Sequence, residues 1–206
     1  MSDLGYIHRF LAPTQPGKPP LVLLHRTGGN EDDLVDFGRR VAPGAALLAL
    51  RGNVLEDGKP RFFRRVARGE FDLDDFKLRT REIGDFITHA RATYGIGAPI
   101  AAGFSNGANI AWSLLLSAPG LLKGAILMRP MLAFDPRPVT SVSGLPVLVI
   151  AGATDAIVPP EDRDAMPALL REAGARVTYE LFRETTILLR RTAMLPQPGW
   201  ISCKFE

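Results

Sequence analysis

The stretch Gly103-Phe104-Ser105-Asn106-Gly107 constrains the fold of this chain more than any other feature. It joins a short apolar run that predicts a buried strand, residues 99–102, to an amphipathic run that predicts a helix, residues 108–116. A turn from a strand directly into a helix is tight, so a side chain at either glycine would collide with the neighbouring backbone. The pattern therefore predicts a strained serine, Ser105, whose hydroxyl is presented at the end of a strand.

Short apolar runs alternate with helical patterns along most of the chain, which predicts an α/β fold with a mostly parallel central sheet and helices on both faces. The predicted strands cover Leu21–His25, Ala46–Arg51, Ile100–Phe104, Ala125–Arg129, Val147–Ala151 and Arg176–Phe182, with Tyr6–Leu11 as an edge strand. The predicted helices cover Glu31–Val41, Asp72–Tyr94, Asn106–Ser117 and Glu161–Ala173. No linker or internal repeat divides this pattern, so we expect residues 1–182 to form one domain.

Composition excludes several classes of protein. Of the 206 residues, 46% are hydrophobic and 23% charged, which is typical of a globular protein in water. No apolar run approaches the roughly 20 residues that span a bilayer, and the first residues lack a signal-peptide pattern. The single cysteine, Cys203, excludes an internal disulfide and favours a cytoplasmic location. A net charge of only +3 does not indicate nucleic-acid binding.

A carboxylate, Asp155, is the second candidate for a reactive site. It follows a fully apolar predicted strand, and reactive groups of open α/β sheets collect at the carboxyl ends of strands. It comes 50 residues after Ser105, which fits the chain order serine, acid, histidine of one class of catalytic triad. In that role Asp155 would orient an imidazole and stabilise its charged form. The alternative is that it only caps a turn.

The loop His25-Arg26-Thr27-Gly28-Gly29 also follows a predicted strand. Backbone amides in such a loop can form half of an oxyanion hole, with the residue after the nucleophile supplying the other half. By position these donors are Thr27 and Asn106. His25 ends a strand well before Ser105, and a histidine there is expected to brace the loop rather than act as a catalytic base.

Taken together, these motifs resemble the carboxylesterase/phospholipase family of α/β-hydrolases, small bacterial carboxylesterases related to acyl-protein thioesterases. The matching stretches are Leu21–Asp32, residues 51–53 and 61–65, Gly103–Asn109, Met128–Met131 and Ala151–Pro159. The resemblance implies an α/β-hydrolase fold in which Ser105 is the nucleophile of a Ser-Asp-His triad. It also implies an acyl-enzyme, short- to medium-chain acyl esters as small-molecule substrates, and no metal or cofactor.

Two departures from the family pattern bear on activity. Arg26 stands where the family has a glycine beside the oxyanion loop, and no histidine follows the last predicted strand. The chain contains only His8, His25 and His89, none of them in that position. Residues 183–206 also include two prolines that disfavour the expected final helix, so they are predicted to be an aberrant tail.

A frameshift would explain the tail. Allowable codons for Glu184–Thr192, read one base earlier, encode Asp-His-His-Leu-Thr-Pro-Ala-Asp, which contains the missing histidine motif at the expected place. The alternative is a genuinely divergent tail. In either case the chain as written is expected to be an impaired esterase, and two further alternatives stay open: a non-catalytic ligand-binding homologue, and a thioesterase or lysophospholipase-type hydrolase. A homodimer is also compatible with the sequence.

The insertion Val54–Phe71 is predicted to fold over the catalytic face. Its aromatic residues Phe62, Phe63 and Phe71 are candidates for an acyl pocket. Its basic cluster consists of Arg61, Arg64, Arg65 and Arg68. Acidic residues surround this cluster, which disfavours a nucleic-acid site and favours internal ion pairs, with an anionic substrate as the remaining alternative.

Overall fold

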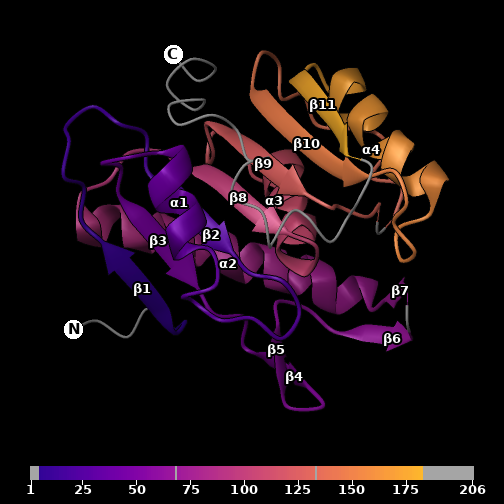
Figure 1. Cartoon of the computed structure of the whole chain (residues 1–206), viewed down its shortest axis with the longest axis horizontal. Helices are drawn as coiled ribbons and strands as arrows, with labels where there is room; N and C mark the ends of the chain where they lie inside the picture. The colour runs from indigo at the N-terminus through magenta and orange to yellow at the C-terminus, as the bar shows by residue number, and fades with distance from the viewer. Residues whose placement is uncertain (1–4, 68, 133, 183–206) are drawn as a thin grey trace.

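The computed structural model describes residues 5–67, 69–132 and 134–182. Within these ranges seven strands form one sheet in the order β1-β3-β2-β8-β9-β10-β11 (Figure 1). The edge strand β1 is antiparallel to β3, and the other neighbouring strands are parallel. The mostly parallel sheet predicted from the sequence is therefore confirmed.

The elements lie close to their predicted positions. The strands of the sheet are β1 (His8–Leu11), β2 (Leu21–Leu24), β3 (Leu47–Leu50), β8 (Ile100–Phe104), β9 (Gly124–Met128), β10 (Pro146–Gly152) and β11 (Arg176–Phe182). The helices are α1 (Val35–Val41), α2 (Leu73–Tyr94), α3 (Asn106–Ser117) and α4 (Pro160–Glu172). The predicted helix Glu31–Val41 is four residues shorter at its start, because residues 31–34 form a turn.

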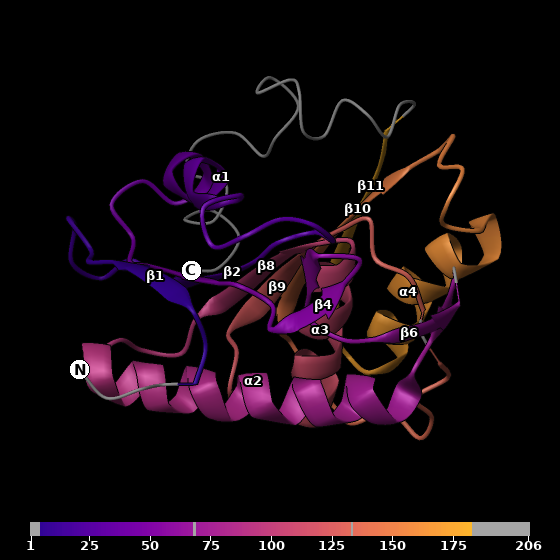
Figure 2. The same cartoon turned by 90° about the horizontal axis from the view of Figure 1, so that it is seen from below.

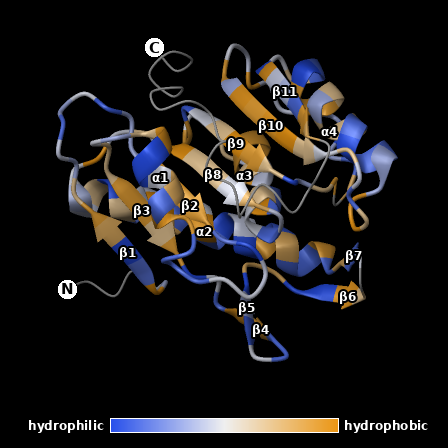
Figure 3. Ribbon diagram, viewed as in Figure 1, coloured by the Kyte–Doolittle hydropathy of each residue, from blue (hydrophilic) through white to orange (hydrophobic). Residues whose placement is uncertain are grey.

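Helices cover both faces of the sheet, α1 on one side and α2, α3 and α4 on the other (Figure 2). The side chains of β2 show why the central strands read as unbroken apolar runs: Leu21 and Leu23 join the core beneath α1, whereas Val22 and Leu24 join the core on the opposite face. Figure 3 shows the same concentration of hydrophobic residues in the central strands. The parallel strands bring their carboxyl ends to a single edge of the sheet, where the loops that follow β2, β8, β9 and β10 meet.

The insertion contains two short hairpins that the sequence analysis did not predict. They are formed by β4 (Val54–Glu56) with β5 (Lys59–Arg61), and by β6 (Arg65–Ala67) with β7 (Glu70–Phe71). The first turns through Asp57 and Gly58, both at positive φ (51° and 72°), which is the geometry that Asp-Gly favours in two-residue hairpin loops.

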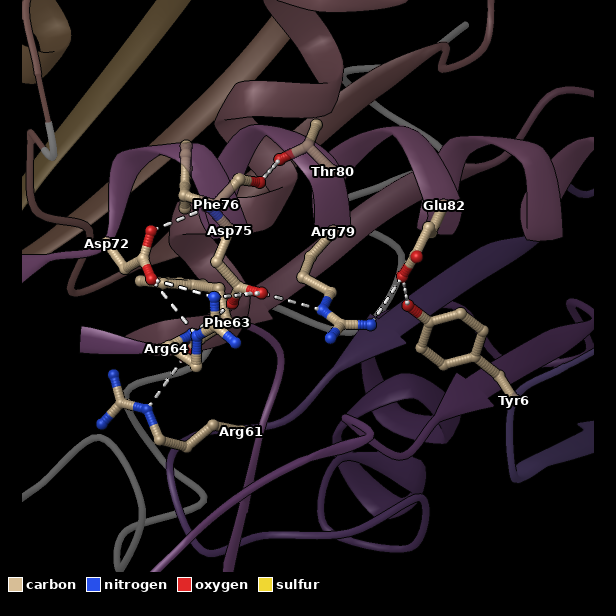
Figure 4. A network of polar contacts seen from close by, with 10 residues as sticks. All are labelled: Tyr6, Arg61, Phe63, Arg64, Asp72, Asp75, Phe76, Arg79, Thr80 and Glu82. Carbon is tan, nitrogen blue, oxygen red and sulfur yellow. Dashed lines mark hydrogen bonds and ion pairs between the residues drawn. The ribbon is translucent and has the colours of Figure 1, made fainter.

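Asp75 on α2 anchors the segment between these hairpins (Figure 4). Its buried carboxylate accepts the backbone N–H of Arg64 at 2.7 Å and the Nε–H of Arg79 at 3.3 Å. Asp72, which caps the start of α2, also binds the Arg64 guanidinium at 3.1 Å. These bonds fix the segment around Arg64, which connects the two hairpins.

Two earlier expectations concern residues outside the described ranges: the aberrant tail, residues 183–206, and Arg68 of the basic cluster. Of the helices within those ranges, none combines the length and apolar character needed to cross a membrane.

Candidate active site

Ser105 lies in the turn between β8 and α3 with φ 51° and ψ −109°, a conformation that non-glycine residues rarely adopt. Its amide donates to the carbonyl of Met128 at 2.8 Å, and its carbonyl accepts from Asn109 at 3.0 Å. Strain of this kind persists only where the surrounding structure imposes it, and it collects at functional sites. The strained serine predicted from the sequence is present.

The two glycines of the motif are required by close packing. A Cβ at Gly103 would lie 2.4 Å from the carbonyl oxygen of Gly107, and a Cβ at Gly107 would lie 2.1 Å from that of Leu24. Both distances are far below van der Waals contact, so helix α3 can approach β2 and β8 this closely only with glycine at these positions.

A cavity of about 260 Å³ opens beside Ser105. Thr27 and Asn106, the predicted oxyanion donors, line it together with Ser105. In the described part of the chain the Thr27 amide donates to no backbone carbonyl, whereas Gly28 and Gly29 donate to Pro60 and Arg26. Asn106 occupies the first position of α3, where backbone N–H groups lack helical acceptors. Both amides are thus available at the cavity.

The side chain of Asn106 has a separate structural task. Its Oδ1 accepts the Phe62 amide at 2.7 Å, which ties the insertion to helix α3. Its Nδ2 is buried and has no hydrogen-bond partner among the described residues. A buried donor without an acceptor is costly, so this amide is suited to a ligand oxygen or an ordered water.

His25 braces the loop, as the sequence predicts. The Gly52 amide donates to Nε2 at 2.9 Å, so Nδ1 carries the proton and donates to the Arg26 carbonyl at 2.6 Å. Burial lowers the pKa of His25, despite the opposing effects of the Arg26 carbonyl and nearby carboxylates. A neutral imidazole with both nitrogens occupied cannot take a proton from Ser105. His8, on β1, hydrogen-bonds to Tyr6 and Tyr94, and His89, on α2, hydrogen-bonds to Asp85. Neither histidine lines the cavity.

Asp155 lies beyond the end of β10, at the same edge of the sheet as Ser105. Its side chain is 1% exposed and forms a two-pronged ion pair with Arg129: Nη2 lies 2.5 Å from Oδ1, and Nε binds Oδ2. The amides of Ile157 and Val158 also donate to Oδ1, at 2.8 Å and 3.2 Å. Burial raises the pKa of Asp155, but the bonds from Arg129 and the two amides outweigh it and hold that pKa below its usual value.

Sequence analysis assigned no role to Arg129, although it matched a family stretch. It follows the buried strand β9 and has φ 57°, and its amide donates to Ile150 on β10 at 2.7 Å. Arg129 lines the cavity, and its side chain is 17% exposed. The sequence signal that could have identified Arg129 is its position, since it is a charged residue directly after a fully buried parallel strand.

The insertion contributes one wall of the cavity, through Arg61, Arg65, Gly69 and Phe71. The prediction that Phe62 and Phe63 line an acyl pocket is wrong, because both are fully buried in the core against His25 and Phe76. Arg64 does not line the cavity either.

Among the described residues no group of His, Cys, Asp and Glu side chains is placed to hold a metal ion.

Comparison with known proteins gives a consistent picture, although no protein-family model matches the chain. The chain is 48% identical over 157 residues to MhqD of Bacillus subtilis, a protein assigned to the hydrolases, across 75% of this chain and 78% of MhqD. The crystal structure of the Bacillus cereus carboxylesterase is 41% identical with a TM-score of 0.84, and the alignment covers 86% and 84% of the two chains. The Mesorhizobium loti carboxylesterase is 31% identical with a TM-score of 0.82, over 92% and 95%.

Proposed function

The chain belongs to the carboxylesterase/phospholipase family of α/β-hydrolases. We propose that its cavity binds and hydrolyses short- to medium-chain carboxylic esters with Ser105 as the nucleophile. The observation that carries the proposal is the backbone of Ser105, strained at positive φ at a strand-to-helix turn. This conformation is typical of a nucleophile elbow, which presents the serine Oγ to a bound carbonyl.

In the proposed reaction the Ser105 oxygen attacks the ester carbonyl carbon, and the amides of Thr27 and Asn106 stabilise the resulting oxyanion. The tetrahedral intermediate collapses, the alcohol leaves, and water then attacks the acyl-enzyme to release the acid. Each half-reaction needs a group that takes a proton from the incoming oxygen and returns one to the leaving oxygen. Asp155 would orient that group.

The general base is the missing component. None of the three histidines of the chain lies at the cavity, so turnover by the chain as written is expected to be slow. Asp155 nevertheless keeps acceptor capacity for a base: in the described part of the chain its Oδ2 accepts only from Arg129, whereas Oδ1 accepts from three donors. A carboxylate oxygen has two lone-pair sites, so Oδ2 can accept an imidazole N–H as well. We propose that residues 183–206 replace the histidine loop through a frameshift.

A serine-directed fluorophosphonate probe tests the assignment of the nucleophile. We expect slow labelling of Ser105, located by mass spectrometry, and no labelling of Ser105→Ala. Ser117→Ala, at the other end of α3 and outside the cavity, should be labelled like the unmodified chain. An adduct that persists on Ser105→Ala would refute the assignment.

A second candidate function is non-catalytic ligand binding, which the absence of a histidine at the cavity favours. Under this alternative, Ser105 would still react with the probe, but restoring a histidine loop would add no esterase activity.

The proposed cytoplasmic location is supported by the single cysteine.

A further inference from the structure

The cavity beside Ser105 has a basic lining. Four arginines line it, and in the described part of the chain no aspartate or glutamate does so. These arginines are Arg26, Arg61, Arg65 and Arg129. The net charge of the cavity lining depends on which of these arginines are neutralised by carboxylates behind the lining.

Two of the four arginines have a carboxylate of their own. Asp155 binds Arg129 through both oxygens, so that pair is neutral. Asp33 lies 3.8 Å from the Nε of Arg26, a looser pair in which the arginine side chain is 46% exposed.

Arg61 and Arg65 share a single carboxylate, that of Glu56. The Nε of Arg61 lies 3.2 Å from Oε2, and the Nη2 of Arg65 lies 2.5 Å from Oε1. Two guanidinium charges therefore face one carboxylate charge, and this wall of the cavity carries an excess of one positive charge. Within the described part of the chain, no other carboxylate pairs with either arginine.

The excess charge is partly removed from water. The side chain of Arg61 is 5% exposed, and its Nε–H also donates to the carbonyl of Phe63 at 3.2 Å (Figure 4). Burial lowers the pKa of Arg61; Glu56 opposes this effect and Arg65 adds to it. A buried cation that shares its counter-ion is stabilised by a second anion.

The chemistry of the wall selects the kind of anion. Guanidinium groups bind carboxylates through paired, charge-assisted hydrogen bonds. An excess of one charge matches a carboxylate, whereas a phosphate monoester carries about 1.5 to 2 negative charges at neutral pH. Asn106, which also lines the cavity, offers a further donor: its buried Nδ2 has no hydrogen-bond acceptor among the described residues.

We propose that the substrate is a small ester that itself carries a carboxylate, bound by Arg65 and Arg61 while its ester carbonyl faces Ser105. This inference rests on the proposed esterase function and adds a substrate class to it. A cavity of about 260 Å³ suits an ester of this small size.

The test compares two ligands that differ only in charge. Mono-methyl succinate carries a carboxylate where methyl succinamate carries a neutral amide of the same shape. Both are titrated by calorimetry into the full chain with Ser105→Ala, which prevents turnover. We expect mono-methyl succinate to bind at least tenfold more tightly. Equal affinities, or no binding of either ligand, would overturn the proposal, as would tighter binding of inorganic phosphate than of mono-methyl succinate.

Two variants test whether Arg65 provides the preference for mono-methyl succinate. Arg65→Gln removes the excess charge from an exposed hairpin and should reduce the preference to less than threefold. Arg39→Gln makes the same change in charge on α1, outside the cavity, and should leave the preference intact. A preference that survives Arg65→Gln, or is lost in Arg39→Gln, refutes the assigned contact. Fluorophosphonate labelling of Ser105 in the unmodified chain is independent of these ligands, so the substrate class can fail while the esterase assignment stands.

Discussion

Arg129 and Asp155, which follow the neighbouring strands β9 and β10, form a buried two-pronged ion pair at the edge of the sheet that also carries Ser105. The left-handed backbone of Arg129 accompanies this placement of its guanidinium. The pair fixes the carboxylate in one orientation and keeps it ionised. It leaves one acceptor site on Oδ2 for the histidine that a triad requires.

Removing the guanidinium should destabilise the fold. In Arg129→Gln the Asp155 carboxylate keeps two amide donors but loses its counter-charge, and breaking a buried pair from one side costs about 3–5 kcal/mol. Because those amides remain, we expect a loss of about 2–4 kcal/mol in the free energy of unfolding, measured in urea. The control is Arg137→Gln. Both partners of Arg137, Asp135 and Glu172, are exposed, so this variant should cost less than about 1 kcal/mol. Equal effects of the two variants would contradict a structural role for the buried pair.

The same carboxylate should make stability depend on pH. The folded pKa of Asp155 lies below its unfolded value, so its contribution is complete above about pH 4 and is lost as the pH falls through the folded pKa. We expect the difference in unfolding free energy between the unmodified chain and Asp155→Asn to be constant above about pH 4 and to shrink as the pH falls below that value. Other carboxylates with lowered pKa, such as Asp72, titrate in both proteins and cancel in this difference. A gap independent of pH would show that the Asp155 pKa is not lowered.

Gly107→Ala should disrupt the turn that holds Ser105. The added Cβ would lie 2.1 Å from a carbonyl oxygen of β2, and backbone cannot give way as a flexible side chain can. We expect a loss of at least about 2–3 kcal/mol in the free energy of unfolding and loss of probe labelling at Ser105. Gly97→Ala adds the same methyl group where no atom lies within 4 Å, and it should be nearly neutral. Comparable stability of the two variants would rule out the packing argument.

Restoring a histidine should restore turnover. Loss of a triad member can lower turnover by about a million-fold, because the serine hydroxyl is then left without a base. We therefore expect very slow hydrolysis of p-nitrophenyl acetate and butyrate by the chain as written. Replacing residues from Glu184 onward by the alternate reading frame should raise the rate by several orders of magnitude. Ser105→Ala in the restored chain is the blank. Fast, Ser105-dependent hydrolysis by the unmodified chain would contradict this expectation and would require another base.

Much of this architecture follows from local sequence. The apolar runs at Leu21–His25 and Val147–Ala151 predict their strands within one residue, because burial on both faces of a parallel sheet leaves few polar positions. The glycines on either side of Ser105 predict the tight turn, because only a missing Cβ permits the close approach of α3 to β2. These are constraints between residues near in the chain.

Tertiary structure decided what depends on long-range proximity. Phe62 and Phe63 are compatible with a substrate pocket by composition, but the bonds from Asp75 and Asn106 to this segment accompany their burial in the core. Arg129 and Asp155 lie 26 residues apart, and neither residue identifies its partner in the sequence. They meet because parallel strands place their carboxyl ends at one edge of the sheet, where the low dielectric of the buried site makes the pairing of opposite charges strong.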